Sequence, residues 1–449
     1  MFVIVFLAIS WFFCGRKVES ILCFFFFLLD GFQIIPLSWF SLGIGLKPMD
    51  YALAYLLGIF VITVLTHNMP VWKDKIMPKF SYLFMAFLVA AIIVSRYFYA
   101  VPWGEILRTV RNFILLLSCF LFYRLSIPEI DRLKKIIFYI TLCLSGVYIL
   151  QAIIGAPILN GYAGGAKMDV LGVTIPRYYN FPILLPYFIY YGLYQYNYHS
   201  NRQKIFISIL LFLPILLSFH RNLIISIIFI LVLNIYLYNK FSSKSFKYTL
   251  LFILILLPSS GMIYDSLNSR GTINDVKAVM EGDFEAFSRT EDFAESTLLL
   301  RMSMLYERTN RMLETPLTTY MGLGLMQEAT PYTMSHFDFV LGIRNEDTGE
   351  IMQVETSDIA WITLFVRFGL LGTVIYLIYY CNLFLFFWKG KDAAVKRTVC
   401  SYMLLMLITS ITNIMICSMA YIVPILLEYT RMKKLKKQEP DLLKLKENE

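Results

Sequence analysis

Residues 354–387, VETSDIAWITLFVRFGLLGTVIYLIYYCNLFLFF, contain a sharp change of composition. The first five residues end a long polar stretch, and the others begin an apolar run of about thirty residues. An α-helix needs about 20 predominantly apolar residues to cross the hydrocarbon core of a bilayer. The run therefore predicts a membrane-spanning helix, and the polar stretch before it predicts a segment outside the membrane.

Similar apolar runs occupy most of the 449-residue chain, which is 58% hydrophobic and only 16% charged. A soluble protein carries roughly 25% charged residues. We therefore predict an all-α, polytopic membrane protein with about 12–14 transmembrane helices. The first apolar run has no basic residues before it and no clear cleavage site, so we interpret it as a retained span. The apolar stretch 398–430 is broken around Asn413 and is predicted to form two short helices.

Basic residues gather in short loops, at 67–79, 124–135 and 388–397, and in the C-terminal tail. Cytoplasmic loops of membrane proteins carry an excess of Lys and Arg, so these segments are predicted to face the cytoplasm. The same rule explains the net charge of +9 without a nucleic-acid partner. The predicted parts are an N-terminal transmembrane bundle, a large external loop, C-terminal transmembrane helices and a basic cytoplasmic tail: 1–263, 264–357, 358–430 and 431–449.

The external loop, 264–357, contains 16 Asp and Glu but only 7 Lys and Arg, a net charge of −9. Loops longer than about 15 residues are usually functional or disordered. Apolar residues recur at helical spacing over 296–313, so we predict a folded, mainly helical subdomain. Arg301 and Arg308 share one face of that helix, either as a basic stripe for an anionic substrate or as a solvated face. The spacing of Glu307 and Arg311 predicts an ion pair.

Three further arginines are candidates for binding an anionic substrate. Arg221 lies between two apolar runs, Arg177 precedes another run, and Arg111 lies near an outer helix end, one turn from Arg108. Arginine is costly near a bilayer and is often functional there. Its planar group of five donors suits a phosphate or diphosphate. The alternative is that these side chains reach the lipid headgroups.

Two acids and a histidine are candidates for a general base. Glu355 and Asp358 stand one helical turn apart where the loop meets an apolar run. They could accept a proton, or they could cap the helix and neutralise its dipole. His336 is the single histidine of the loop, and a structural role is its alternative. Arg367, nine residues after Asp358, is expected to project to the opposite helix face.

No cofactor or metal is expected from the sequence. The seven cysteines form no C-x-x-C pair and none lies in the external loop, which argues against a zinc site or a disulfide framework. Gly322-x-Gly324 does not open a βαβ unit, so a tight turn is expected there rather than a nucleotide site.

The order of several local motifs resembles the O-antigen polymerase and O-antigen ligase superfamily of bacterial envelope glycosyltransferases. The chain also shares the overall plan of many spans with one large external loop before the last few. The motifs are Arg177 in the segment 177–182, Arg221 in Ser-Phe-His-Arg-Asn, Arg301 opening the loop helix, Pro316 followed by Gly322-x-Gly324, and the segments 358–364 and 368–372.

The resemblance implies a metal-independent, inverting glycosyltransferase of the membrane-embedded C type. Its donor would be a glycan on undecaprenyl diphosphate at the outer face of the bacterial inner membrane, and arginines would stabilise the leaving diphosphate. Ligases of the family usually carry a histidine where this chain has Ser357-Asp358, which favours a repeat-unit polymerase for O-antigen, capsule or exopolysaccharide. A ligase acting on lipid A core and a transporter or flippase for lipid-linked glycan are the alternatives. A chain-length regulator or a flippase is a conceivable partner.

Overall fold

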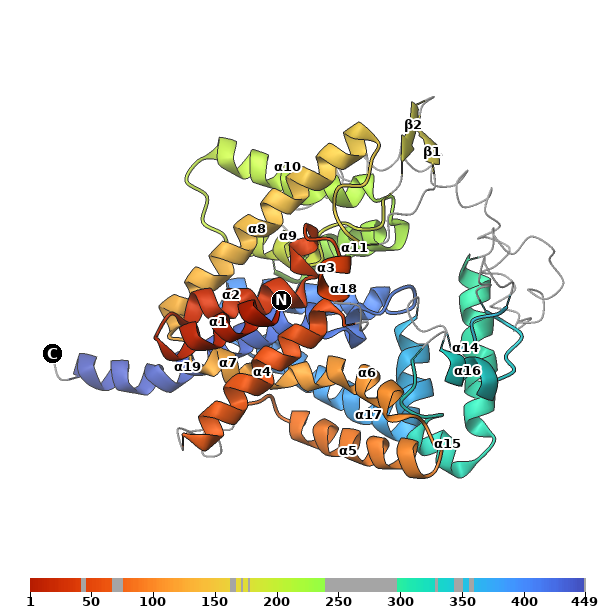
Figure 1. The fold of residues 1–449 in the computed structure, drawn as a ribbon. Helices are drawn as coiled ribbons and strands as arrows, with labels where there is room; N and C mark the ends of the chain where they lie inside the picture. Colours follow the sequence, from red (N-terminus) through yellow and green to blue (C-terminus); the bar gives the residue numbers. More distant parts are fainter. Residues whose placement is uncertain are drawn as a thin grey trace.

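The computed structural model describes residues 1–41, 46–66, 76–161, 167–170, 173–176, 178–238, 297–327, 330–342, 350–354 and 359–447 (Figure 1). Helices dominate this part of the chain, as predicted. The exception is a two-stranded antiparallel hairpin in which β1 (Lys167–Val170) pairs with β2 (Val173–Pro176). The hairpin lies in the connection between the helices that end at Ile154 and begin at Leu185.

The N-terminal part builds most of the bundle. A capping box, in which the Ser126 hydroxyl and the Glu129 carboxylate each bond the other's backbone amide, begins the longest helix of this part, α8. The elements are α1 (Phe2–Phe13), α2 (Lys17–Leu28), η1 (Gly31–Gln33), α3 (Ser38–Ser41), α4 (Pro48–Leu65), α5 (Ser81–Tyr97), α6 (Trp103–Ile114), η2 (Leu115–Ser118), α7 (Cys119–Tyr123), α8 (Ile127–Ile154), α9 (Leu185–Tyr194), α10 (Asn201–Leu217) and α11 (Arg221–Tyr238).

The C-terminal part contains the loop helices and the last helices of the chain. These are α14 (Thr297–Leu313), α15 (Pro316–Met321), α16 (Pro331–His336), α17 (Ala360–Trp388), α18 (Ala393–Thr409), η4 (Met415–Cys417) and α19 (Met419–Glu447). The predicted break around Asn413 is confirmed, because α18 ends at Thr409 and α19 begins at Met419. Helix α19 continues through residue 430, where the sequence predicted the start of a separate tail.

Within the described ranges, four helices are long and apolar enough to cross a membrane: Pro48–Leu65, Trp103–Tyr123, Ile127–Ile154 and Ala360–Trp388. Three shorter apolar helices, Phe2–Phe13, Ser81–Tyr97 and Arg221–Leu237, accompany them. Length and composition therefore support a membrane protein. The predicted total of 12–14 spans stays a prediction.

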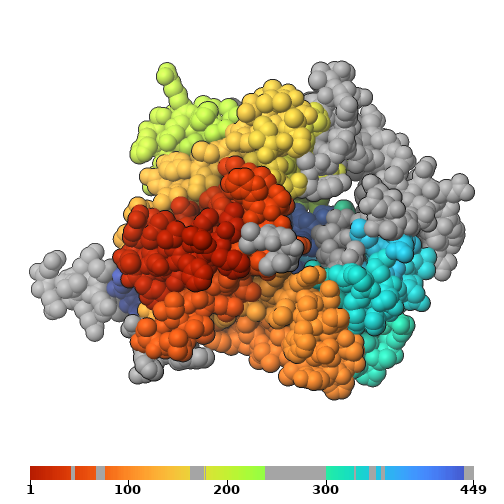
Figure 2. All heavy atoms as spheres, in the orientation of Figure 1, coloured from red at the N-terminus to blue at the C-terminus, as the bar shows by residue number. Residues whose placement is uncertain are grey.

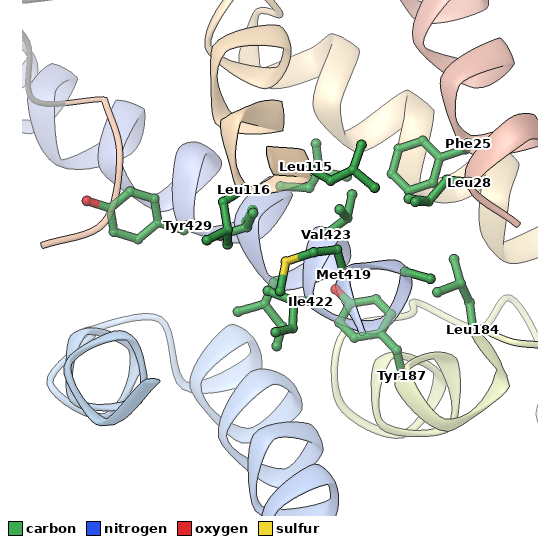
Figure 3. Packing of buried hydrophobic residues seen from close by; sticks show 14 of the residues in the cluster. Phe25, Leu28, Leu115, Leu116, Leu184, Tyr187, Met419, Ile422, Val423 and Tyr429 are labelled. Carbon is green, nitrogen blue, oxygen red and sulfur yellow. The ribbon is translucent and has the colours of Figure 1, made fainter. Parts of the chain in front are cut away.

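Helix α19 lies at the centre of the hydrophobic core (Figure 3). Its side chains Met419, Ile422 and Val423 are almost completely buried, and they pack among residues of α2, η2 and α9. Between apolar helices in lipid, such close packing stabilises association where the hydrophobic effect contributes little. The last helix in the sequence thus packs against η2, α7 and α8 of the N-terminal part, whereas α1, α2 and α4 pack against one another.

The basic segments meet at one end of the bundle. The Lys17 ammonium donates to the Arg124 carbonyl at 3.0 Å, and the Lys434 ammonium donates to the Leu125 carbonyl. At the same end Arg431 pairs with Asp131 at 2.7 Å. The predicted cytoplasmic cluster at 124–135 and the start of the basic tail therefore share one end, which we call the basic end. Its orientation relative to a membrane stays a prediction.

The loop helices form a second, smaller core with the start of α17. Helix α14 confirms the predicted helix over 296–313, and Met304 and Met312 supply its buried face. Thr315 caps α15 with Pro316 in the first helical turn. We call residues 297–354 the loop subdomain; residues 264–296 of the predicted loop lie outside the described residues.

The predicted turn at Gly322-x-Gly324 is confirmed, and it joins the loop subdomain to α17. Gly322 has φ +80°, and the Leu323 amide donates to the Val366 carbonyl at 2.7 Å. A Cβ on Gly322 would lie only 2.6 Å from the Val366 oxygen. Opposite, Gly369 (φ +61°) interrupts the helical geometry of α17. Glycine is required on both sides because the two backbones touch.

Candidate functional site

A cleft of about 720 Å³ opens where the loop subdomain meets the bundle. Its walls come from residues 30–49, α6, the first third of α17, the segment 414–418 and Gln327. Asp30 follows the end of α2, and the first residues of α4, the second half of α6 and the first third of α17 line the cleft. In the space-filling view the loop subdomain lies beside α5 and α6 (Figure 2).

The walls of the cleft are predominantly cationic. Among the described lining residues four are basic, namely Lys47, Arg108, Arg111 and Arg367, and one is acidic, Asp30. Cations that surround a concave, partly desolvated space attract an anion more strongly than they would on an open surface. The cleft is therefore suited to a ligand that carries at least two negative charges.

Arg111 is held in place by the N-terminus of α4. Its Nη1 lies 2.5 Å from Asp50 Oδ1, and the Asp50 carboxylate also accepts the Lys47 amide at 2.8 Å. The Arg111 side chain keeps 13% of its surface exposed, toward the cleft. One of its donors is thus used for orientation, while the rest of the fork faces the cavity.

Arg367 and Arg108 complete the arginine cluster. Arg367, half-buried on α17, donates from Nε to the Met326 carbonyl at 3.1 Å. Arg108 is 56% exposed, and its guanidinium is 3.9 Å from the Glu105 carboxylate. The cluster thus combines two positioned arginines with one on the rim.

Hydrogen bonds tie the walls of the cleft together. The Asn112 amide donates to the Cys417 carbonyl at 2.8 Å, and its oxygen accepts the Met419 amide at 3.1 Å. The Gln327 amide donates to Glu105 at 3.2 Å, and its side chain donates to the Thr109 hydroxyl at 3.0 Å. These hydrogen bonds connect helix α6 to the start of α19 and to the loop segment that follows Gly324.

Asp30 begins a turn with an unusual backbone. Asp30, Phe32 and Gln33 all have positive φ, at 53°, 52° and 57°, and Gly31 between them has φ +67°. Left-handed geometry costs a non-glycine residue about 1–3 kcal/mol and persists only where the surroundings impose it. The buried Gln33 supplies that constraint, because its side chain donates to the Asn180 carbonyl at 3.3 Å and accepts the Ile183 amide at 3.0 Å.

Burial raises the pKa of the Asp30 carboxyl to about 6, and the nearby Lys47 ammonium opposes that shift. Asp30 lies between α2 and η1 and is half-buried. A carboxyl with this pKa is mostly ionised at neutral pH, but it holds a proton more tightly than an ordinary aspartate does.

The structure places the sequence-predicted arginines in different surroundings. Arg111 lines the cleft. Arg221 is the first residue of α11, is half-buried and does not line the cleft. The side-chain amide of its neighbour Asn222 donates to the Thr412 hydroxyl, and Thr412 precedes the wall segment 414–418 in the sequence. Arg177 lies outside the described residues.

The predicted basic stripe on α14 is not present as such, because Arg308 is directed inward. Its side chain is 1% exposed, and it contacts the Glu307 carboxylate at 2.6 Å, the Gln353 carbonyl at 2.8 Å and the Phe339 ring. Helical spacing alone could not show that the loop folds back over this face. Arg301 is half-buried on the same helix and does not line the cleft.

The predicted pair Glu307–Arg311 is wrong. Arg311 pairs with Glu314 at 2.6 Å, whereas the Glu307 carboxylate accepts the Val340 and Leu341 amides at 2.7 and 3.1 Å. Glu307 is drawn away because those amides of the returning loop offer it stronger, partly buried hydrogen bonds.

The predicted bases do not meet at the cleft within the described residues. His336 is exposed; its ring stacks on Tyr332 with centroids 4.0 Å apart, and it is not among the cleft residues. Glu355 and Asp358 lie outside the described residues. No group of three His, Cys, Asp or Glu side chains that could hold a metal ion occurs in the described ranges.

Sequence reasoning missed Asp30, Arg367 and Gln327. Asp30 could have been recognised as a candidate site residue, because this charged residue interrupts an apolar run beside Gly31. Arg367 could also have been recognised, because a cation inside a predicted span is often functional. Gln327 has no feature in the sequence that marks it as a site residue.

No protein-family model matches this chain, and no curated protein matches it either.

Proposed function

We propose that this protein is a membrane glycosyltransferase that polymerises oligosaccharide repeat units carried on undecaprenyl diphosphate. The observation that carries the proposal is the cleft of about 720 Å³ on which Arg108, Arg111 and Arg367 converge. The resemblance of the motifs around Arg221 and Gly322, and of the segments 358–364 and 368–372, to the O-antigen polymerase and ligase superfamily supplies the chemistry. Each part alone would be weaker evidence, and both require an anionic lipid-linked substrate.

The chemistry demands stabilisation of a diphosphate leaving group. As the glycosidic bond to the diphosphate breaks, negative charge develops on the oxygen that departs. Guanidinium groups can take up that charge with bidentate hydrogen bonds, so the reaction needs no metal ion. The excess of basic over acidic residues around the cleft favours such a group.

The position of the cleft suits a substrate with a lipid part and a sugar part. It lies at the ends of apolar helices, where a diphosphate at the bilayer surface would sit, and the loop subdomain forms one wall beside Gln327. In the proposed arrangement this end faces outward from the bacterial inner membrane, with the basic end in the cytoplasm. The acceptor glycan would then extend along the loop subdomain.

The test is polymerisation by the purified protein in lipid nanodiscs. The substrate is the undecaprenyl-diphosphate-linked repeat unit extracted from a strain that lacks this protein. We expect a ladder of longer glycans from the wild type, and a loss of at least a hundredfold in rate for Arg111→Ala and Arg367→Ala. Arg311→Ala is the matched control, because Arg311 is exposed, paired with Glu314 and outside the cleft.

Other outcomes would identify the alternatives. Transfer of finished polymer to lipid A core without chain growth would indicate a ligase. Movement of labelled lipid-linked glycan across the membrane without a new glycosidic bond would indicate a flippase. No product from a folded wild-type protein would contradict the proposal.

A further inference from the structure

We propose that Asp30 is the general base of the reaction, taking the proton from the acceptor hydroxyl in the arginine cleft. This inference rests on the proposed glycosyl transfer. It assigns a catalytic residue that the sequence motifs do not contain, because those motifs direct attention to Glu355, Asp358 and His336.

Asp30 is the acid that faces the arginine cluster. Among the described residues it is the sole acidic side chain in the walls of the cleft, which it shares with Arg108, Arg111 and Arg367. A base must lie close to both the attacking hydroxyl and the group that binds the leaving phosphate. The shared cavity provides that proximity.

The carboxylate of Asp30 is not engaged elsewhere in the described structure. The other acids around the cleft hold structural partners: Asp50 binds Arg111 and the Lys47 amide, and Glu105 accepts the Gln327 amide. The Asp30 side chain makes no hydrogen bond or ion pair with any described residue, and the Asp30 backbone carbonyl accepts the Gln33 amide at 3.1 Å. An acid of this kind, held in a cationic cleft without a structural partner, is available to a ligand.

The turn that carries Asp30 is strained but fixed. Its left-handed residues are locked by Gln33, whose carbonyl accepts the Asn160 amide at 2.7 Å and whose side chain binds the segment 180–183. Strain that is maintained by surrounding contacts is typical of pre-organised functional sites. The position of Asp30 is therefore set by the backbone, and its carboxylate needs no ion pair to hold it.

The proposed transfer is a single displacement at the anomeric carbon. The acceptor hydroxyl gives its proton to an Asp30 carboxylate oxygen while the hydroxyl oxygen forms a bond to the anomeric carbon. The bond from that carbon to the diphosphate oxygen breaks, and its electron pair leaves with the lipid diphosphate, held by Arg111 and Arg367. Asp30 then releases the proton to water, and no oxidant, reductant or metal is consumed.

The electrostatic surroundings suit this role. Burial raises the pKa of Asp30 to about 6, which places it near the pH at which a base is most effective. The charged and titratable groups that face it from neighbouring elements are Lys47 before α4, Arg108 and Arg111 on α6, Arg367 on α17 and Tyr421 on α19. The Lys47 ammonium favours the carboxylate, and desolvation outweighs its effect.

The experiment compares Asp30→Asn with the wild type in the full-length protein in nanodiscs. Asparagine tolerates left-handed geometry about as well as aspartate, so the turn should persist. We expect turnover of the lipid-linked repeat unit to fall by about 10²–10⁴-fold, the usual weight of general-base catalysis. Binding of undecaprenyl diphosphate should change by less than threefold, because the arginines are intact. Glu314→Gln, an exposed acid on the loop subdomain, is the matched control.

The pH profile provides a second measurement. The wild-type rate should fall tenfold per pH unit below about 6 and level off above it, because only the ionised carboxylate accepts a proton. Asp30→Glu should retain part of the rate and the same acidic limb. In Asp30→Asn the limb should disappear from the residual rate.

The outcomes separate this inference from the proposed function. A wild type that polymerises, together with Asp30→Asn turnover within threefold of it, overturns the role of Asp30 alone. Loss of undecaprenyl-diphosphate binding in Asp30→Asn also overturns it, in favour of a structural role. If Asp30→Asn does not fold, a wild-type profile without a limb near pH 6 overturns it. A wild type that neither binds undecaprenyl diphosphate nor polymerises overturns both proposals.

Discussion

Arg111 in the cleft and Arg308 in the loop subdomain make nearly the same ion pair but have different surroundings. Arg111 lies 2.5 Å from Asp50, and Arg308 lies 2.6 Å from Glu307. The Arg308 guanidinium is covered by the Phe339 ring and by the chain near Gln353, and the side chain is 1% exposed. Arg111 is 13% exposed and borders a cavity of about 720 Å³.

The difference shows that a carboxylate partner does not by itself assign an arginine to structure or to function. The role of an arginine depends on its remaining donor groups, which either contact other protein atoms or border a cavity. Arg308 uses its donors to close the loop over α14, so its role is structural. Arg111 keeps donors for a ligand. Substitutions of these residues test the distinction.

The largest effect is expected on activity, from Arg111→Ala. Each charge-assisted hydrogen bond contributes about 1.5–3 kcal/mol, so loss of a bidentate contact should lower polymerisation by about 10²–10⁴-fold. Arg111→Lys should recover only part of the rate, since an ammonium lacks the planar fork. Initial rates with extracted lipid-linked repeat units provide the measurement. A rate within threefold of the wild type would remove Arg111 from the site.

The next effect is expected on stability, from Arg308→Ala. Removing one partner of a buried ion pair leaves the other uncompensated and costs about 3–5 kcal/mol. Protease cleavage in the loop subdomain should therefore accelerate strongly, while undecaprenyl-diphosphate binding by the intact protein persists. Loss of binding at unchanged protease resistance would instead give Arg308 a direct role in the cleft.

A smaller effect, with a defined pH dependence, is expected from Asp30→Asn on stability. The pKa of about 6 in the folded protein exceeds the ordinary value of 3.8, so the folded state holds this proton more tightly. That contribution to stability is fully present below about pH 4 and is lost as the pH rises through about 6. The difference corresponds to at most about 3 kcal/mol.

Asp30→Asn should therefore raise the midpoint of thermal unfolding at pH 8 relative to the wild type, and change it less at pH 5. Parallel melts in the same nanodiscs measure both. Increased stability together with lost turnover is expected where a buried charge is retained for function. A variant less stable than the wild type at pH 8 would show that the charge contributes to folding.

The smallest effects are expected from Arg311→Ala and Asp358→Asn. Arg311 and Glu314 are about half exposed, and exposed ion pairs contribute about 0–1 kcal/mol. Asparagine has the size of aspartate but lacks its basicity, so Asp358→Asn should leave turnover nearly unchanged if Asp30 is the base. A loss of a hundredfold or more in Asp358→Asn would return the role of base to the acid that the motifs predicted.

The sequence by itself determined the elements. The apolar run after Asp358 predicted α17, and helical periodicity predicted α14, because both signals depend on neighbours a few residues apart. Gly322 was also predictable as a turn residue, since a need for left-handed geometry is local.

Only the tertiary structure decided which charges meet. The cleft joins α6 to segments more than 300 residues away, as the bond from Asn112 to Cys417 shows, and no periodicity extends so far. Burial separated Arg308 from Arg111, although both are arginines on amphipathic helices. Asp30 joins the candidate site because a left-handed turn, fixed by contacts with Asn160, Asn180 and Ile183, places it in the wall of the cleft that arginines of two other helices also line.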